Sequence, residues 1–146
     1  MVYKIGLIDV DSHNFPNILL MKISAFYKSM GSEVQFVHWN ELSTGEKISD
    51  FYNEVFISKI FTESVEPAGM LLCANVHRGG SGYDLKNKLP DSIEHIYPDY
   101  SLYAELTKDT AFGMLTRGCP RCNHGFCITP EKDGKCSRKV ADLTEF

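Results

Sequence analysis

The chain has 146 residues, of which 43% are hydrophobic and 23% charged, and its net charge is −4. This length allows one compact domain but not two of full size, and this composition excludes a disordered chain. The acidic balance argues against a nucleic-acid-binding protein. No stretch approaches the roughly 18 apolar residues of a membrane helix and no signal peptide is visible, so a cytoplasmic protein outside the membrane is expected.

Residues 1 to about 85 predict a small α/β fold. Mostly apolar, β-branched stretches predict four strands, at 2–9, 33–39, 55–61 and 70–76. Between the first two, apolar residues recur at helical spacing, with Asn14 as the expected cap, Pro16 in the first turn and Gly31 as the stop. This order predicts a small Rossmann-like parallel sheet with flanking helices.

Polar residues follow the predicted strands, at 9–13, 59–62 and 77–82. Because ligands of parallel sheets gather at the carboxyl ends of the strands, these segments are candidates for a binding site. The segment at 77–82 reads HRGGSG, and its backbone N–H groups could cradle a phosphate. It lacks the lysine-serine ending of a P-loop, so a mobile glycine turn is the favoured alternative.

The chain divides into a Rossmann-like region with its connector, at 1–110, and a cysteine-rich region at 111–146. The connector, from 84 to about 110, contains two prolines and three tyrosines and is expected to pack against the α/β region. A last short strand is predicted at 111–115, leading into the cysteines.

Cys119, Cys122 and Cys127 follow the spacing C-x2-C-x4-C. In a reducing compartment, clustered cysteines are metal ligands or redox groups before they are disulfides. Glycine and proline residues supply the turns that would let the three sulfur atoms converge. Arg117 and Arg121 are expected to lower the pKa values of the thiols and to offset the charge of a thiolate-bound cluster.

Two kinds of metal centre fit this spacing. In a four-iron cluster, three cysteines leave one iron free to bind a substrate or cofactor. In a zinc site, Cys119, Cys122 and Cys127 would be joined by a fourth ligand, either Cys136 or His124. The zinc protein would be a non-catalytic binding module. Spacing alone leaves both open.

The stretch from Gly113 to Cys127, GMLTRGCPRCNHGFC, resembles the opening of a radical S-adenosylmethionine (SAM) barrel, with Phe126 as the aromatic residue before the last cysteine. The tail EKDGKCSRKVADLTEF and the segments IDVDSHNFPN, GGSGYD and HIYPDYSLY are similar to a little-characterised bacterial and phage group of these proteins. That group has an amino-terminal domain like those that bind cobalamin. The resemblance implies a 4Fe-4S cluster on Cys119, Cys122 and Cys127, with SAM as a cofactor.

Two departures from this family are visible. Its usual loop is C-x3-C-x2-C, whereas here the loop is one residue longer and the middle cysteine comes one position earlier. The chain also includes only about one strand of the barrel, so it resembles a truncated member that is incomplete for catalysis. The expected partner is a small-molecule cofactor. Substrate, reaction and oligomeric state stay open.

The segment from Asp11 to Pro16 resembles the D-x-H-x-x-G loop of cobalamin-binding domains, with proline replacing glycine. In that family the histidine, here His13, ligates cobalt, and the aspartate, here Asp11, holds its other ring nitrogen. Ser58, Gly79 and Gly80 fall where such domains place a serine and paired glycines around the nucleotide tail. The alternative is that Asp11 and His13 only cap and orient the helix.

Overall fold

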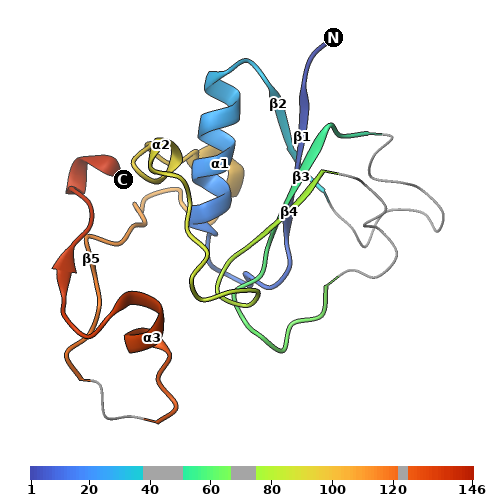
Figure 1. Ribbon diagram of the computed structural model, residues 1–146. Helices are drawn as coiled ribbons and strands as arrows, with labels where there is room; N and C mark the ends of the chain where they lie inside the picture. Colours follow the sequence, from blue (N-terminus) through green and yellow to red (C-terminus); the bar gives the residue numbers. More distant parts are fainter. Residues whose placement is uncertain (38–50, 67–74, 122–124) are drawn as a thin grey trace.

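The structure, a computed structural model, describes residues 1–37, 51–66, 75–121 and 125–146. It is an α/β protein with a four-stranded parallel sheet and flanking helices, compatible with a Rossmann-like fold (Figure 1). In the described ranges no helix has the length and hydropathy needed to cross a bilayer. The elements in chain order are β1 (Lys4–Asp9), α1 (Ile18–Ser29), β2 (Glu33–Phe36), β3 (Glu54–Ser58), β4 (Val76–Gly79), α2 (Asp91–Glu94), η2 (Tyr100–Tyr103), β5 (Thr116–Arg117), α3 (Thr129–Asp133), β6 (Arg138–Lys139) and η3 (Leu143–Glu145).

The main sheet has the strand order β2-β1-β3-β4, and every neighbouring pair is parallel. Ile5 in the central strand pairs with Val34 on one side and Glu54 on the other, and Val55 pairs with Val76. The predicted parallel sheet is therefore confirmed. Because all strands run the same way, their carboxyl ends lie together along one edge of the sheet.

The core lies on both faces of β1. Ile5 and Leu7 point toward α1 and pack with Leu20 and Ile23, while Ile8 packs on the opposite face with Val55 and Ile57. This alternation confirms a strand buried on both sides. Burying one such aliphatic side chain contributes about 1.5–3 kcal/mol, so these contacts dominate the stability of the sheet.

The start of α1 differs from the prediction. Asn17, not Asn14, is the N-cap, and its side-chain oxygen accepts a hydrogen bond from the N–H of Leu20 at 3.3 Å. Asn14 instead has a φ of 61°, outside helical geometry. Pro16 disfavours helical geometry at the residue before it, so the helix begins only after the proline.

The end of α1 is as predicted. Gly31 has a φ of 83°, and its N–H donates to the carbonyl of Lys28 at 3.0 Å. The N–H of Ser32 donates to the carbonyl of Tyr27 at 3.0 Å, which completes a Schellman motif. The left-handed conformation that this motif requires explains the glycine.

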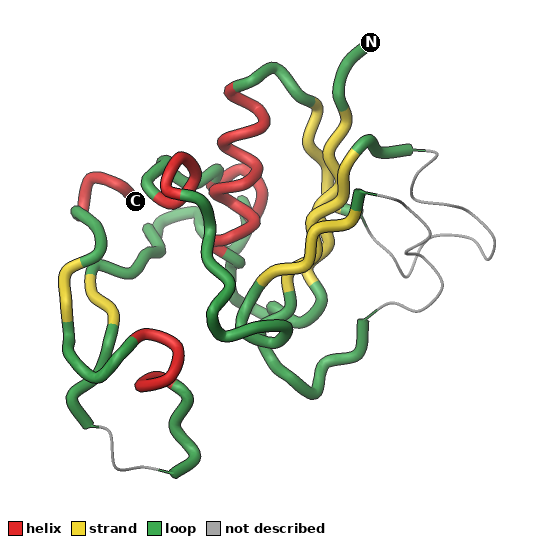
Figure 2. Tube along the Cα trace, viewed as in Figure 1, coloured by secondary structure: helices red, strands yellow, loops and turns green. Residues whose placement is uncertain are grey.

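The connector packs against α1, as the sequence predicted (Figure 2). The N–H of Asp99 donates to the carbonyl of Met21 at 3.1 Å, and its carboxylate accepts hydrogen bonds from Ser24 and Lys28, both at 2.6 Å. Burial raises the pKa of Asp99, but hydrogen bonds from Lys28, Ser101 and Ser24 outweigh burial and lower it overall.

Some strand bounds differ from the prediction. β3 ends at Ser58 instead of continuing to residue 61, and β4 extends to residue 79, beyond the predicted 70–76, of which 70–74 lie outside the described residues. Residues 111–115 form no strand. The strand before the cysteines is the two-residue β5, which pairs antiparallel with β6.

Candidate functional site

The topology singles out the carboxyl ends of β1 and β3. From β1 the chain moves to one side of the sheet, to β2, and then returns to the other side, to β3. Ligands of open α/β sheets bind outside the strand ends at such a reversal. Asp11, His13 and Ser58 all lie at this edge, close to the ends of β1 and β3.

Asp11 is 5% exposed and connects the loops after these two strands. Its carboxylate accepts hydrogen bonds from the N–H of Ile60, at 2.9 and 3.1 Å, and from the N–H of Phe61, at 2.8 Å. The side chain of His13 is exposed, and no described residue bonds to its ring. The Asp11–His13 side-chain pairing that the cobalamin resemblance implies is therefore not formed here. Asp11 orders the backbone of the neighbouring loop instead.

Ser58 is buried and belongs to the cap of α1. Its hydroxyl accepts a hydrogen bond from the side-chain amide of Asn17 at 2.7 Å, while the oxygen of that amide caps Leu20. Asn17 thus joins the first turn of α1 to the end of β3. Sequence reasoning missed Asn17 because Asn14 offered the same capping chemistry three residues earlier.

Gly80 lets the loop after β4 approach the loop after β3. Gly80 has a φ of 95°, and a Cβ at this position would collide with the backbone of Lys59. The N–H of Lys59 donates to the carbonyl of Gly79 at 3.1 Å, and the N–H of Gly82 donates to the carbonyl of Lys59 at 2.9 Å. Gly79 ends β4 and so lies in the sheet. The close approach that Gly80 permits is used for a contact within the protein.

A cleft of about 490 Å³ opens beside this edge, between the start of α1, the loop after β4 and the carboxyl-terminal segment. Of the predicted residues it includes Ser58 and Gly80, and it does not include Asp11, His13 or any described cysteine. Sequence reasoning missed Lys22, which also lines the cleft. A lysine among apolar helix residues is the one signal that could have indicated it.

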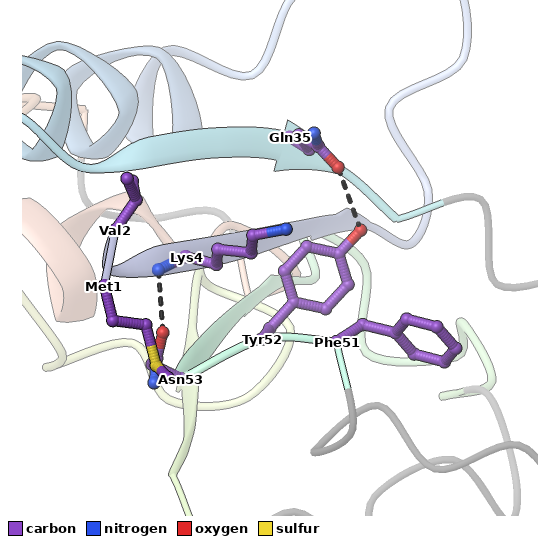
Figure 3. Close-up of a pocket in the computed structure, with 7 residues that line it drawn as sticks. All are labelled: Met1, Val2, Lys4, Gln35, Phe51, Tyr52 and Asn53. Carbon is purple, nitrogen blue, oxygen red and sulfur yellow. Dashed lines mark hydrogen bonds between the residues drawn. The ribbon is translucent and has the colours of Figure 1, made fainter.

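A second hollow, of about 330 Å³, lies at the opposite ends of the strands (Figure 3). The N–H of Lys4 donates to the side chain of Asn53 at 2.8 Å, and the ring of Tyr52 lies above β1. A Cβ on Gly6 would come within 3.0 Å of that ring. These contacts hold the segment before β3 against the sheet, at the edge where parallel sheets do not bind ligands.

The cysteine loop is closed at its base by backbone contacts. The N–H of Cys119 donates to the carbonyl of Gly134 at 3.1 Å. Gly118 has a φ of 90°, and a Cβ there would collide with the carbonyl of Cys136. The loop can therefore close only with glycine at 118, which is the turn-forming role that the sequence predicted for this residue.

The thiol of Cys127 is favoured as a thiolate by its neighbour Thr129. Hydrogen bonds from the hydroxyl and the backbone N–H of Thr129 lower its pKa, because they stabilise the thiolate. Arginines were expected to do this. Arg117 instead donates to the carboxylate of Asp133 at 3.4 Å, so its charge is partly neutralised.

Cys119, Cys127 and Cys136 are free thiols, with no disulfide among them. These three do not form a group that could hold one metal ion, and neither does any other set of His, Cys, Asp and Glu in the described part of the chain. Cys122 and His124, two of the predicted ligands, lie outside the described residues. The predicted set of Cys119, Cys122 and Cys127 is therefore represented by only two of its members.

Comparison with protein families, with curated proteins and with solved structures finds no match to this chain.

Proposed function

We propose that the chain is an iron–sulfur protein related to radical SAM enzymes, with Cys119, Cys122 and Cys127 as the ligands of a 4Fe-4S cluster. The observation that carries the proposal is the environment of Cys127, whose thiol is prepared for ionisation by two donors from Thr129. A cysteine binds iron as its thiolate, and a thiol with a lowered pKa loses its proton more readily when the metal binds.

The backbone of the loop supports the same proposal. Cys119 is held at the base of the loop by Gly134, while Gly118 provides a turn that other residues cannot adopt without strain. A cluster held by these three thiolates would supply an electron to a bound SAM. The protein contributes three thiolates and a closed loop. The proposal covers cluster and SAM binding, and turnover is not part of it.

The zinc alternative uses Cys136 as the fourth ligand, and one observation favours it. Gly118 packs against the carbonyl of Cys136, so the backbones of Cys119 and Cys136 run close together. However, three of the four ligands of that site are described, and they do not form a group that could hold one ion. This finding counts against the four-cysteine zinc site, whereas only two of the three cluster ligands are among the described residues.

The test is reconstitution of the purified chain with iron and sulfide without oxygen. We expect a brown protein with broad absorption in the violet and blue, and a change in the electron paramagnetic resonance spectrum of the reduced cluster when SAM is added. Cys127→Ser should lose most of the iron, while Cys136→Ser, the matched control, should keep it. A colourless protein that holds one zinc ion, released by Cys136→Ser, would contradict the proposal.

A further inference from the structure

Lys22 lies in the second turn of α1 and is 4% exposed. Burial lowers the pKa of its ammonium group, because a buried charge loses its hydration. The ammonium donates a hydrogen bond to the backbone carbonyl of Glu94, but no carboxylate in the described ranges forms a salt bridge with it. Buried lysines are normally paired with a carboxylate, so this environment requires an explanation.

The ammonium group of Lys22 faces a cleft and an aromatic ring. Its side chain lines the 490 Å³ cleft, and its ammonium nitrogen is 5.1 Å from the centre of the Phe146 ring. An ammonium group has three N–H donors, and within the described ranges Lys22 donates a hydrogen bond to one carbonyl only. The Phe146 ring can partly satisfy the charge, but a ring is a weaker partner than an anion.

The cationic side chains that line the cleft slightly outnumber the acidic ones. Arg117, in the carboxyl-terminal segment, repels the positive charge of Lys22. Glu94 and Glu145, in two other elements, attract it. The whole chain has a net charge of −4, yet the cleft is lined by five cationic residues against four acidic ones. The five cationic residues are Lys22, Lys88, Arg117, Lys132 and Arg138. The cleft is therefore more positive than the rest of the surface.

Polar groups from the sheet edge complete the cleft. Gly80 and Ser81, from the loop after β4, line it together with the first turn of α1. Its volume lies within the range of roughly 300–1,000 Å³ that is usual for small-molecule sites. We propose that this cleft binds the phosphate or carboxylate group of a small molecule, with the buried Lys22 as the charged anchor. The proposal does not depend on the iron–sulfur cluster, because none of the described cysteines lines the cleft.

The test uses the full chain and two simple anions, inorganic pyrophosphate and citrate, titrated by isothermal calorimetry. At least one should bind, and the preferred anion distinguishes a phosphate site from a carboxylate site. Lys22→Met should weaken binding at least tenfold, because the anchor is lost while the side-chain volume is kept. Lys88→Met is the matched control, since Lys88 lines the same cleft but is exposed, and it should change binding less than twofold.

Two results would overturn the proposal. One is that neither anion binds the wild-type chain. The other is that Lys88→Met weakens binding as much as Lys22→Met, which would indicate only a diffuse positive surface. If Lys22→Met does not fold, amide chemical shifts of the wild-type chain decide the question. Pyrophosphate or citrate should then shift the amides of Ile18 and Ser81, and shifts confined to exposed residues far from the cleft would refute the site.

Discussion

The two regions of this chain are held together by different means. Among the described residues of 1–110, ten buried hydrophobic side chains fill the space on both faces of the sheet, whereas among those of 111–146 only Ala141 is a buried hydrophobic residue. The second region has two strands of two residues and a helix of five. Its loop is closed by backbone contacts at Gly118 and Gly134.

This difference indicates how each region responds to change. A region with a core loses stability when a buried contact is removed, and the loss appears in global unfolding. A region without a core depends on a few backbone conformations and, according to our proposal, on a bound metal. Substitutions in the first region should therefore change global stability, while those in the second should change the loop and its thiols.

The largest effect is expected at Asp11. Asp11→Ala removes the acceptor of the Ile60 and Phe61 N–H groups, so the free energy of unfolding should fall by about 3 kcal/mol. Urea denaturation followed by circular dichroism measures this. Asp109→Ala, at an exposed position, should change it by less than about 0.5 kcal/mol. Equal losses for both variants would contradict the structural role of Asp11.

The next effect separates the two regions directly. Gly118→Ala would force a Cβ into the carbonyl of Cys136 and strain a φ of 90°, which should destabilise the loop by about 2 kcal/mol. Limited proteolysis should then cleave faster between Arg117 and Lys139, while the sheet unfolds as before. Gly125→Ala is the control, because a Cβ there meets nothing within 4 Å. Destabilisation of the sheet by Gly118→Ala would show that the two regions are not independent.

A smaller effect is expected at Asp99 and depends on pH. The pKa of Asp99 is lowered in the folded state, so its stabilisation is present above the unfolded value, about 3.9, and disappears as the pH falls through the folded value. Asp99→Asn should lower the free energy of unfolding by about 1–2 kcal/mol at pH 7. The difference from wild type should shrink below pH 4. A difference that is constant from pH 7 to pH 3 would contradict this assignment.

The smallest effect is expected at Thr129. Thr129→Val removes the hydroxyl that donates to Cys127, so the pKa of the thiol should rise and its alkylation by iodoacetamide at pH 7 should slow roughly threefold. Peptide mapping measures the rate at Cys127 alone. Thr144→Val, at an exposed position, should leave the rate unchanged, and global unfolding should not change in either variant.

The sequence predicted the strongly apolar elements well and the polar ones poorly. β1 and α1 were predicted because their apolar residues, such as Ile5 and Leu7 in β1 and Leu20 in α1, have the spacing of a buried strand and of a buried helix face. Residues 77–79 of β4 were not predicted as strand, because β4 is an edge strand whose exposed His77 and Arg78 give no apolar pattern.

The candidate site was predicted only in part, for a similar reason. Ser58 and Gly80 were indicated by the resemblance to cobalamin-binding domains, and Gly80 also by its place after a predicted strand. Lys22 reaches the cleft only because the connector and the carboxyl-terminal segment pack around it, bringing Glu94 and Phe146 beside its ammonium group. β5 was missed likewise, since its partner β6 lies about 20 residues further along the chain. Local sequence patterns carry no information on contacts of this kind.

The hydroxyl of Tyr103 donates to the carboxylate of Asp9, at the end of the central strand. Together with Ile93 and Leu102 in the core and the Asp99 backbone bond to α1, this contact fastens the connector at several points. Amide hydrogens at Asp99 and Leu102 should therefore exchange with solvent only when the whole sheet opens. The connector adds no strand to the sheet, yet it belongs to the same cooperative unit. A ligand that binds the connector would therefore slow the unfolding of the sheet and α1 as well.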